Sequence, residues 1–166
     1  MAHEKQLQLP LLVVSPTDLS RLKREVEALD EYMRQAAVRK GGEQLAKLPR
    51  TSRMLDEFAA ANELSLLHGE LRKQALEFLG TLQTEAPVLN MSFARDPSSA
   101  FEAKIIAWLR QNIHPTVLLR VGLQPTMAAG CTLRTPNHYF DFSLRAHFAE
   151  QHQLLVEKLQ KAGSGS

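Results

Sequence analysis

Apolar residues recur every three or four positions in the first part of the chain. The recurring residues are Leu19, Leu22, Val26, Leu29 and Met33, and Ala36 continues the series. This spacing places them on one face of a helix, and its heptad-like form is typical of a face that packs against another helix. Ser15 and Pro16 mark the helix start, and Asp18 stands where a capping box has its acidic group. The helix is expected to end at Arg39-Lys40, before Gly41-Gly42.

A second helical region follows a connector over residues 43–50. Thr51 or Ser52 is expected to cap a short helix that runs to about Ala61, and a longer helix is predicted over 62–85. One face of the longer helix carries Leu64, Leu67, Leu71, Ala75, Phe78 and Leu82. Gly69 lies inside this predicted helix, where it costs about 1 kcal/mol relative to alanine.

The heptad-like face of residues 19–33 has two interpretations. It can form an antiparallel hairpin with the helix over 62–85, because a short coiled-coil repeat is marginal alone. It can also be a docking surface for a partner helix, made by Leu19, Leu22, Val26, Leu29 and Met33. The sequence leaves both open.

The remaining pattern alternates between strands and helices. Strands are predicted at Leu9–Val14, 88–94, 116–123, 130–135 and 139–142. A helix is predicted over 97–113, started by Asp96-Pro97 and stopped by His114-Pro115. A last helix is expected from about Ser143, with Leu144, Phe148, Leu155 and Leu159 on it.

The order of these elements predicts the fold class and the domains. From residue 88 it is β-α-β-β-β-α, which indicates an α+β fold: a small β-sheet with helices packed on one face, preceded by a helical hairpin. We expect an N-terminal part over 1–87 with one strand and the hairpin, and an α+β domain over 88–162. Residues 163–166, Gly-Ser-Gly-Ser, have the composition of an added linker.

Composition narrows the possible functions. The chain has 166 residues and a formal net charge of +2, so its charge gives no strong attraction to nucleic acid or anionic membranes. Cys131 is the single cysteine, which excludes an intramolecular disulfide and suits a reducing compartment. No apolar run approaches the roughly 18 residues of a membrane helix. These features favour a cytoplasmic protein without direct membrane insertion.

The sequence offers little for catalysis. No phosphate-binding loop, dinucleotide fingerprint or zinc motif is present. His147 and His152 are five apart, which points them to different helix faces, so no metal site is expected. His138, Asp141 and Ser143 are the residue types of a hydrolase triad. They lie too close in sequence for its usual geometry, so we expect Asp141 and Ser143 to cap the last helix.

Three further side chains have ordinary structural interpretations. Cys131 is expected to be a small buried side chain, since a free cysteine is usually buried and inert. Phe101 and Trp108 are expected to lie in the core. No cofactor, metal or catalytic residue is predicted, and an enzyme of an unrecognised type ranks last among the interpretations.

One motif gives the chain a recognisable likeness. Ala129-Gly130 opens a strand, Arg134 closes it, and Asp141, Ser143, Leu144 and Arg145 follow a turn and a second strand. This order, over about 88–159, resembles the C-terminal domain of the delta subunit of F-type ATP synthases, called the oligomycin-sensitivity-conferring subunit in mitochondria. Pro136-Asn137 replaces the family's usual Gly-Asp turn, and Phe142 replaces the glycine of its Asp-Gly-Ser.

The resemblance implies a function in assembly. It implies a non-catalytic stator connector in the peripheral stalk of a proton-translocating ATP synthase, attached to the membrane only through the complex. The implied partner is a helix of the stalk b subunit. The family's N-terminal helix bundle, which residues 1–87 do not match, would add the alpha subunits of the catalytic head. The alternative is an adaptor or regulatory protein with the same fold, binding an unrelated helix through residues 17–40 and 62–85.

Overall fold

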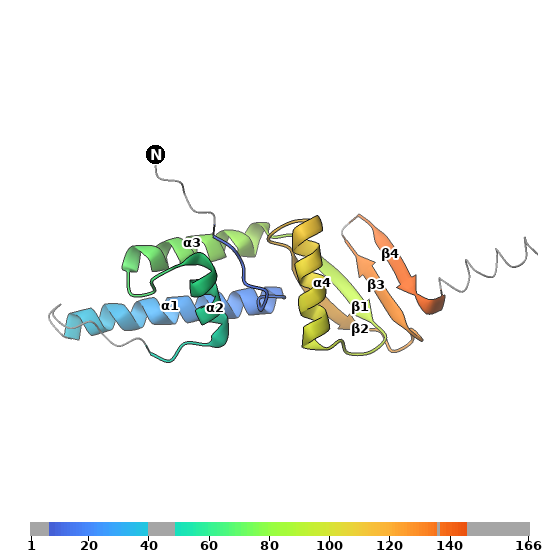
Figure 1. Cartoon of the computed structure of the whole chain (residues 1–166), viewed down its shortest axis with the longest axis horizontal. Coiled ribbons are helices and arrows are strands. Elements are labelled where there is room, and N and C mark those ends of the chain that lie inside the picture. The colour runs from blue at the N-terminus through green and yellow to red at the C-terminus, as the bar shows by residue number, and fades with distance from the viewer. Residues whose placement is uncertain (1–6, 40–48, 136, 146–166) are drawn as a thin grey trace, which may run out of the picture. The chain divides into compact units, whose positions relative to one another are not determined.

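The computed structural model describes residues 7–39, 49–135 and 137–145 (Figure 1). Its elements, in chain order, are α1 (Pro16–Arg39), α2 (Arg53–Asn62), α3 (Gly69–Glu85), β1 (Val88–Phe93), α4 (Ser99–Asn112), β2 (Leu118–Leu123), β3 (Gly130–Arg134) and β4 (Tyr139–Ser143). Helices and one four-stranded sheet make this an α+β fold, as the sequence predicts. The tail of the predicted last helix lies outside the described residues.

The chain divides into two compact units. The first comprises Met1–Val88 and Ala100–Leu119, and the second comprises Leu89–Ser99 and Arg120–Ser166. The chain first passes from the first unit to the second after Val88. Most of α4 belongs with the first unit.

The start of α1 has the predicted capping box. The amide of Asp18 donates to Ser15 Oγ at 3.2 Å, and the amide of Ser15 donates to Asp18 Oδ2 at 2.9 Å. Two amides that the helix itself cannot satisfy are thereby paired. The expected end at Gly41-Gly42 lies outside the described residues.

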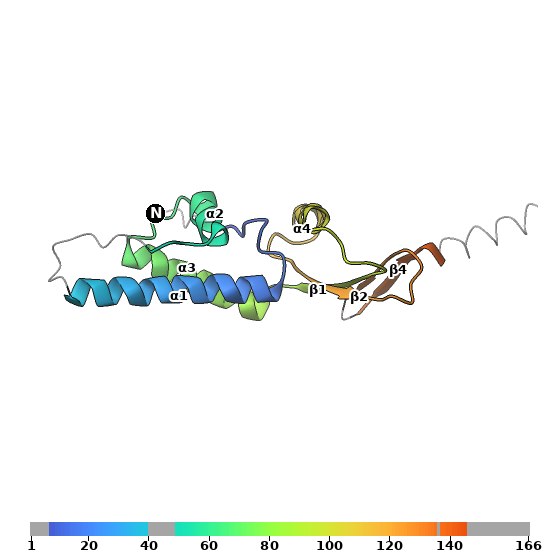
Figure 2. The same cartoon turned by 90° about the horizontal axis from the view of Figure 1, so that it is seen from below.

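The predicted hairpin is present in the first unit. Asp30 of α1 meets Arg72 of α3, and Lys23 meets Gln83, so the two helices run antiparallel (Figure 1). Helix α2 lies on one side of this pair (Figure 2). The apolar side chains between the three helices include Leu19, Leu22, Val26, Leu29, Leu55, Phe58, Ala75, Leu79 and Leu82.

The predicted continuous helix over 62–85 is wrong at its start. Ser52 caps α2 by accepting the Leu55 amide at 3.3 Å, and the helix ends where Glu63 takes a left-handed φ of 53°. Helix α3 then begins at Gly69, so this glycine lies at a helix start and not in an interior. The apolar spacing continued through the break because Leu64, in the connecting turn, packs partly buried against the core. Leu67 of the same predicted face is 39% exposed, and Leu66 is buried in its place.

The predicted strand at Leu9–Val14 is also wrong. The segment is irregular: the amide of Val13 turns back to the Pro10 carbonyl at 3.1 Å. The guanidinium of Arg110 donates hydrogen bonds to the carbonyl of Pro10, at 2.8 Å, and to the carbonyl of Val13. The Arg110 side chain thus satisfies these carbonyls, and the backbone amide of Leu119 donates to the Val14 carbonyl at 2.8 Å. The apolar run reflects the burial of Val13 and not sheet formation.

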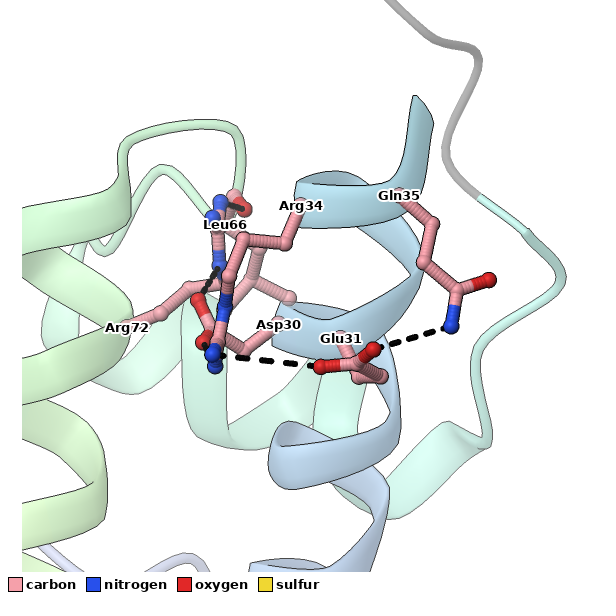
Figure 3. A network of polar contacts seen from close by, with 6 residues as sticks. All are labelled: Asp30, Glu31, Arg34, Gln35, Leu66 and Arg72. Atoms are coloured by element: carbon pink, nitrogen blue, oxygen red, sulfur yellow. Dashed lines mark hydrogen bonds and ion pairs between the residues drawn. The ribbon is translucent and has the colours of Figure 1, made fainter. Parts of the chain in front are cut away.

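A buried ion pair joins α1 to α3, and its arginine also binds the turn before α3 (Figure 3). Arg72 Nε donates to Asp30 Oδ1 at 2.8 Å, and its Nη1 donates to the carbonyls of Leu66, at 2.8 Å, and Leu67, at 3.0 Å. Arg34 donates to the second oxygen of Asp30 at 2.6 Å. The hydrogen bond from Arg72, followed by that from Arg34, lowers the pKa of Asp30.

The sheet has the strand order β2-β1-β3-β4, with β3 antiparallel to both β1 and β4. Its register aligns Phe93 with Cys131 and Phe142, and Met91 with Leu133 and Phe140. Residues directly opposite one another share a face of the sheet. Met91, Phe93, Cys131, Leu133, Phe140 and Phe142 are therefore on one face, and Thr132, Asp141 and Ser143 are on the other.

Two core assignments of the sequence are wrong. Trp108 is 58% exposed and Phe101 is 48% exposed, whereas α4 buries Ile106 and Leu109. The helix carries apolar residues on more than one face, and tertiary packing selects which of them is buried. Cys131 is half-buried and not fully buried, and this partial burial raises the pKa of its thiol.

Candidate functional site

The motif residues of the resemblance other than Arg134 lie where β3 begins and β4 ends. Gly130 pairs with Ser143 across the two strands, and the amide of Leu144 donates to the Ala129 carbonyl at 2.9 Å. Gly130 has a φ of +100°, which side-chain-bearing residues rarely adopt. A Cβ atom there would lie 2.4 Å from the Phe142 carbonyl oxygen. Glycine at 130 thus permits the close approach of the two strands.

Asp141 and Ser143 form a local turn at the end of β4. The amide of Ser143 donates to Asp141 Oδ1 at 2.8 Å. Hydrogen bonds from the Ser143 hydroxyl and amide, with a smaller contribution from the charge of Arg145, lower the pKa of Asp141. The carboxylate therefore braces the chain where it leaves the sheet, close to the capping role that the sequence indicated.

Phe142 adopts this turn without a left-handed backbone. Among the described residues, the only non-glycine residue with positive φ is Glu63. A side chain at the position of the family's glycine is therefore compatible with the extended end of β4.

A hollow of about 510 Å³ lies beside this turn, on the polar face of the sheet. Its lining consists of Gln124, Thr126, Met127, Ala128, Thr132, Tyr139, Asp141, Ser143, Leu144 and Arg145. Four residues of the predicted motif thus lie beside side chains of the β2–β3 connection. They are Asp141, Ser143, Leu144 and Arg145. Thr132 is buried, with 6% of its surface exposed. Carboxylate, guanidinium and hydroxyl groups in one concavity suit recognition of a polar side chain or chain end.

The other motif residues stand apart from the hollow's lining. Ala129 and Gly130 form the backbone junction beneath it, and Arg134 is exposed at the opposite end of β3, paired with Tyr139 and Asn90. The sequence missed Thr132, Tyr139 and Met127. The first two could have been found from strand alternation, since they share a face with Asp141, whereas Met127 lies in a connection without periodicity.

Comparisons with known proteins do not assign this chain to a family. No family model matches it. No curated protein is detectably similar. It is similar to a chain in the cryo-EM structure of the Toxoplasma gondii mitochondrial ATP synthase hexamer, with 17% sequence identity and a TM-score of 0.38. The match covers 81% of this chain and 97% of that one. A likeness this distant carries no inference about function.

The residues of the predicted partner-helix surface are placed in the first unit's core. Leu19, Leu22 and Val26 are at most 1% exposed. Leu29 is 3% exposed, and Met33 packs partly buried against the same core. In this fold the chain's own helices α2 and α3 cover the heptad-like face of α1, which is the intramolecular interpretation. A partner would have to displace α2 or α3 to reach it.

The residues that the structure describes contain neither a metal-binding cluster nor a membrane-spanning helix. Within them, no group of three or more His, Cys, Asp and Glu side chains could hold a metal ion. No helix among them is long and apolar enough to span a bilayer. His138 packs its ring against Phe140, 6.0 Å between centroids, on the face opposite Asp141 and Ser143. The three residue types of a triad are thus not brought together.

A second hollow of about 430 Å³ lies in the first unit, lined by Arg110, Phe78 and Thr116 among others. Burial lowers the pKa of Arg110 to about 10. Its guanidinium donates to main-chain carbonyls of residues 9–13 and 117. These neutral acceptors satisfy the buried donors, so Arg110 has a structural role here: it holds the N-terminal segment on α4.

Proposed function

We propose that this protein is a non-catalytic connector of the peripheral stalk in a proton-translocating F-type ATP synthase. The observation that carries the proposal is the terminal motif: Gly130, Asp141, Ser143 and Arg145 have the residue types and order found in the C-terminal domain of the delta family. In the fold these residues occupy one hairpin end, and three of them line one hollow. The matching β-α-β-β-β order of the elements gives the proposal further support.

The proposed mechanism is packing and not chemistry. A helix of the stalk b subunit would lie across the hollow, with its apolar side chains on Met127 and Leu144. Asp141 and Arg145 would pair with polar groups at the rim of that contact, where charges set orientation more than affinity. A connector of this kind holds the stalk so that rotor torque is not dissipated. The residues of α1 that face the core take no part.

The test is native mass spectrometry of the full chain with the fragment of the stalk b subunit, and separately with the catalytic head, of its own organism. We expect a complex with the stalk fragment that Asp141→Ala and Arg145→Ala both weaken. Asp96→Ala and Arg95→Ala are matched controls, because both side chains are exposed and lie outside the hollow. The proposal fails if the wild-type chain binds neither component, or if the hollow variants bind as tightly as their controls.

A helix-binding adaptor unrelated to ATP synthase is the second candidate. The observation that favours it is the exposed apolar surface near α4, where Trp108 is 58% and Ile113 is 53% exposed. Exposed tryptophan is enriched in protein interfaces. Trp108 is the chain's single tryptophan, so its fluorescence reports this surface directly. A blue shift with an unrelated helical partner, and none with stalk or head, would favour the adaptor.

A further inference from the structure

Strand β4 ends the sheet and has one open edge. It is last in the strand order β2-β1-β3-β4, and no strand of the described residues pairs with its outer side (Figure 1). All of its residues except Ser143 are exposed. An edge strand with exposed apolar side chains is a template for pairing with another chain, unless charges, a bulge or a cover block it. The contacts along β4 show which of its main-chain groups are available.

Alternate residues of β4 direct their main-chain groups to this open edge. The amide of Thr135 donates to the His138 carbonyl at 2.8 Å, so residue 138 bonds toward β3. In an antiparallel ladder this direction alternates along the strand. The residues that bond toward β3 therefore have even numbers, and those with odd numbers direct their amides and carbonyls outward. The outward residues are Tyr139, Asp141 and Ser143.

The side chain of Asp141 shortens the available stretch. The amide of Ser143 donates to Asp141 Oδ1 at 2.8 Å, so it is not available to another strand. The outward amides and carbonyls of Tyr139 and Asp141 remain, with Phe140 between them. Phe140 is 45% exposed, and its ring stacks on Phe142 with 6.2 Å between centroids. The centre of the available edge is thus an exposed aromatic side chain.

We propose that two copies of this chain pair β4 with β4, antiparallel, about a two-fold axis at Phe140. In this register Tyr139 lies opposite Asp141 of the second copy, and each such pair exchanges two main-chain hydrogen bonds. All the available outward groups are then used. Phe140 lies opposite the same residue of the second copy in a non-hydrogen-bonded pair, the type in which side chains come closest. The phenylalanine stack therefore continues across the axis.

Other registers fit this edge less well. Antiparallel pairing centred on Asp141 sets two like charges opposite each other, which destabilises a strand pair, and it needs the Ser143 amide. Pairing centred on Phe142 needs the same amide. Pairing centred on Tyr139 leaves only that residue of β4 opposite β4. A shift by one residue would oppose outward groups to inward ones.

The pairing is closed and separable from the stalk proposal. Because both copies use the same edge, the contact is isologous and stops at a dimer. Phe140 is on the sheet face opposite Asp141 and does not line the hollow, so its substitution tests the pairing without changing the hollow's side chains. The inference therefore does not depend on the ATP synthase proposal.

Sedimentation equilibrium of the full chain measures the pairing. One short strand pair buries less surface than a standard interface, so we expect a monomer–dimer equilibrium with a Kd in the micromolar range or weaker. Phe140→Lys and Phe140→Glu each set like charges across the axis and should weaken the Kd about tenfold or more. An equal mixture of the two variants should form a heterodimer about fivefold to tenfold tighter than either homodimer, because opposite charges then meet.

Leu123→Lys is the matched control for these variants. Leu123 is 57% exposed and ends β2, the strand at the opposite edge of the same sheet. This substitution also replaces an exposed apolar side chain with a charge, and it should leave the Kd unchanged.

Three results would overturn the inference. The first is a wild-type chain that stays monomeric at every concentration, which would mean that another segment or partner covers the edge. The second is equal weakening of the dimer by Leu123→Lys and Phe140→Lys. The third is a mixture of Phe140→Lys and Phe140→Glu that associates no more tightly than either variant alone, which would refute the axis at Phe140.

A second measurement decides the case if circular dichroism shows that the charged variants do not fold. In a chain with Cys131→Ser, the further substitution Phe140→Cys places one thiol per copy beside the axis. Mild oxidation with diamide should then give a disulfide-linked dimer on a non-reducing gel. Leu123→Cys in the same background should give at most a minor amount. Equal yields from the two variants would contradict the proposed pairing.

Discussion

Replacing Gly130 with alanine should destabilise the second unit. The new Cβ would lie 2.4 Å from the Phe142 carbonyl oxygen and 2.8 Å from Ser143 Cα, and both are main-chain atoms that cannot rotate away. The φ of +100° adds backbone strain of about 1–2 kcal/mol. Relief of the overlap by shifting β4 costs about a further 1–3 kcal/mol. The expected total is about 2–5 kcal/mol, a large part of the stability of a small unit.

The matched control is the same substitution in α3. A Cβ on Gly80 would meet only Lys23 Nζ, at 3.9 Å, which is an ordinary contact with a flexible side chain. Gly80→Ala should therefore stabilise the chain by about 0.5–1 kcal/mol, through helix propensity. The two variants are predicted to change stability in opposite directions.

The assay must report the second unit. Trp108 lies in the first unit, so its fluorescence is not suitable alone. We suggest urea titration followed by circular dichroism, with hydrogen exchange of peptides covering β3 and β4. Faster exchange in those peptides, and unchanged exchange in α1 and α3, is the expected result for Gly130→Ala. If Gly130→Ala exchanges like the wild type, the close approach of Gly130 to β4 is refuted.

Three other predictions follow from the polar contacts. Asp30→Asn should cost about 2–3 kcal/mol in urea unfolding, because Arg72 is then buried without its counter-charge. The pKa of Asp30 in the folded chain is below its usual 3.8, so the stabilisation by its carboxylate is complete above about pH 4. The wild type should lose this stabilisation as the pH falls through the folded pKa. Asp30→Asn has no carboxylate at this position and should not show that loss. Arg110→Met should speed exchange or proteolysis in residues 7–14, and Arg120→Met, at an exposed position, should not. Asp141→Ala should lower thermal stability and stalk binding; no change in either would contradict its bracing role at the end of β4.

Local signals in the sequence predicted most of the elements. The Ser15–Asp18 capping box, Ser52 and the His114-Pro115 stop act within one or two turns of a helix, so they can be recognised without knowledge of the fold. The strand pattern after residue 88 was also predictable, because alternation follows from backbone geometry. At the candidate site, the sequence singled out Gly130, and the structure supplies the physical reason for a glycine there.

Other features depended on contacts between distant residues. The apolar run at 9–14 resembles a strand, yet Arg110, about a hundred residues later, supplies donors to its carbonyls. The sequence predicted that Trp108 is buried. This prediction failed because α4 carries apolar residues on more than one face, and only tertiary packing decides which of them is buried. The pairing of Arg72 with Asp30 likewise has no local signature.

The sequence by itself therefore determined the α+β class, the capped starts of α1 and α2, and the chain order of the four strands after residue 87, since these depend on periodicity and on neighbours along the chain. Tertiary structure alone decided that the heptad-like face of α1 is buried against other helices of the same chain, because burial depends on which surfaces come into contact. It also decided that Thr132, Tyr139 and Asp141 share one hollow, because strand register brings together residues that the sequence separates.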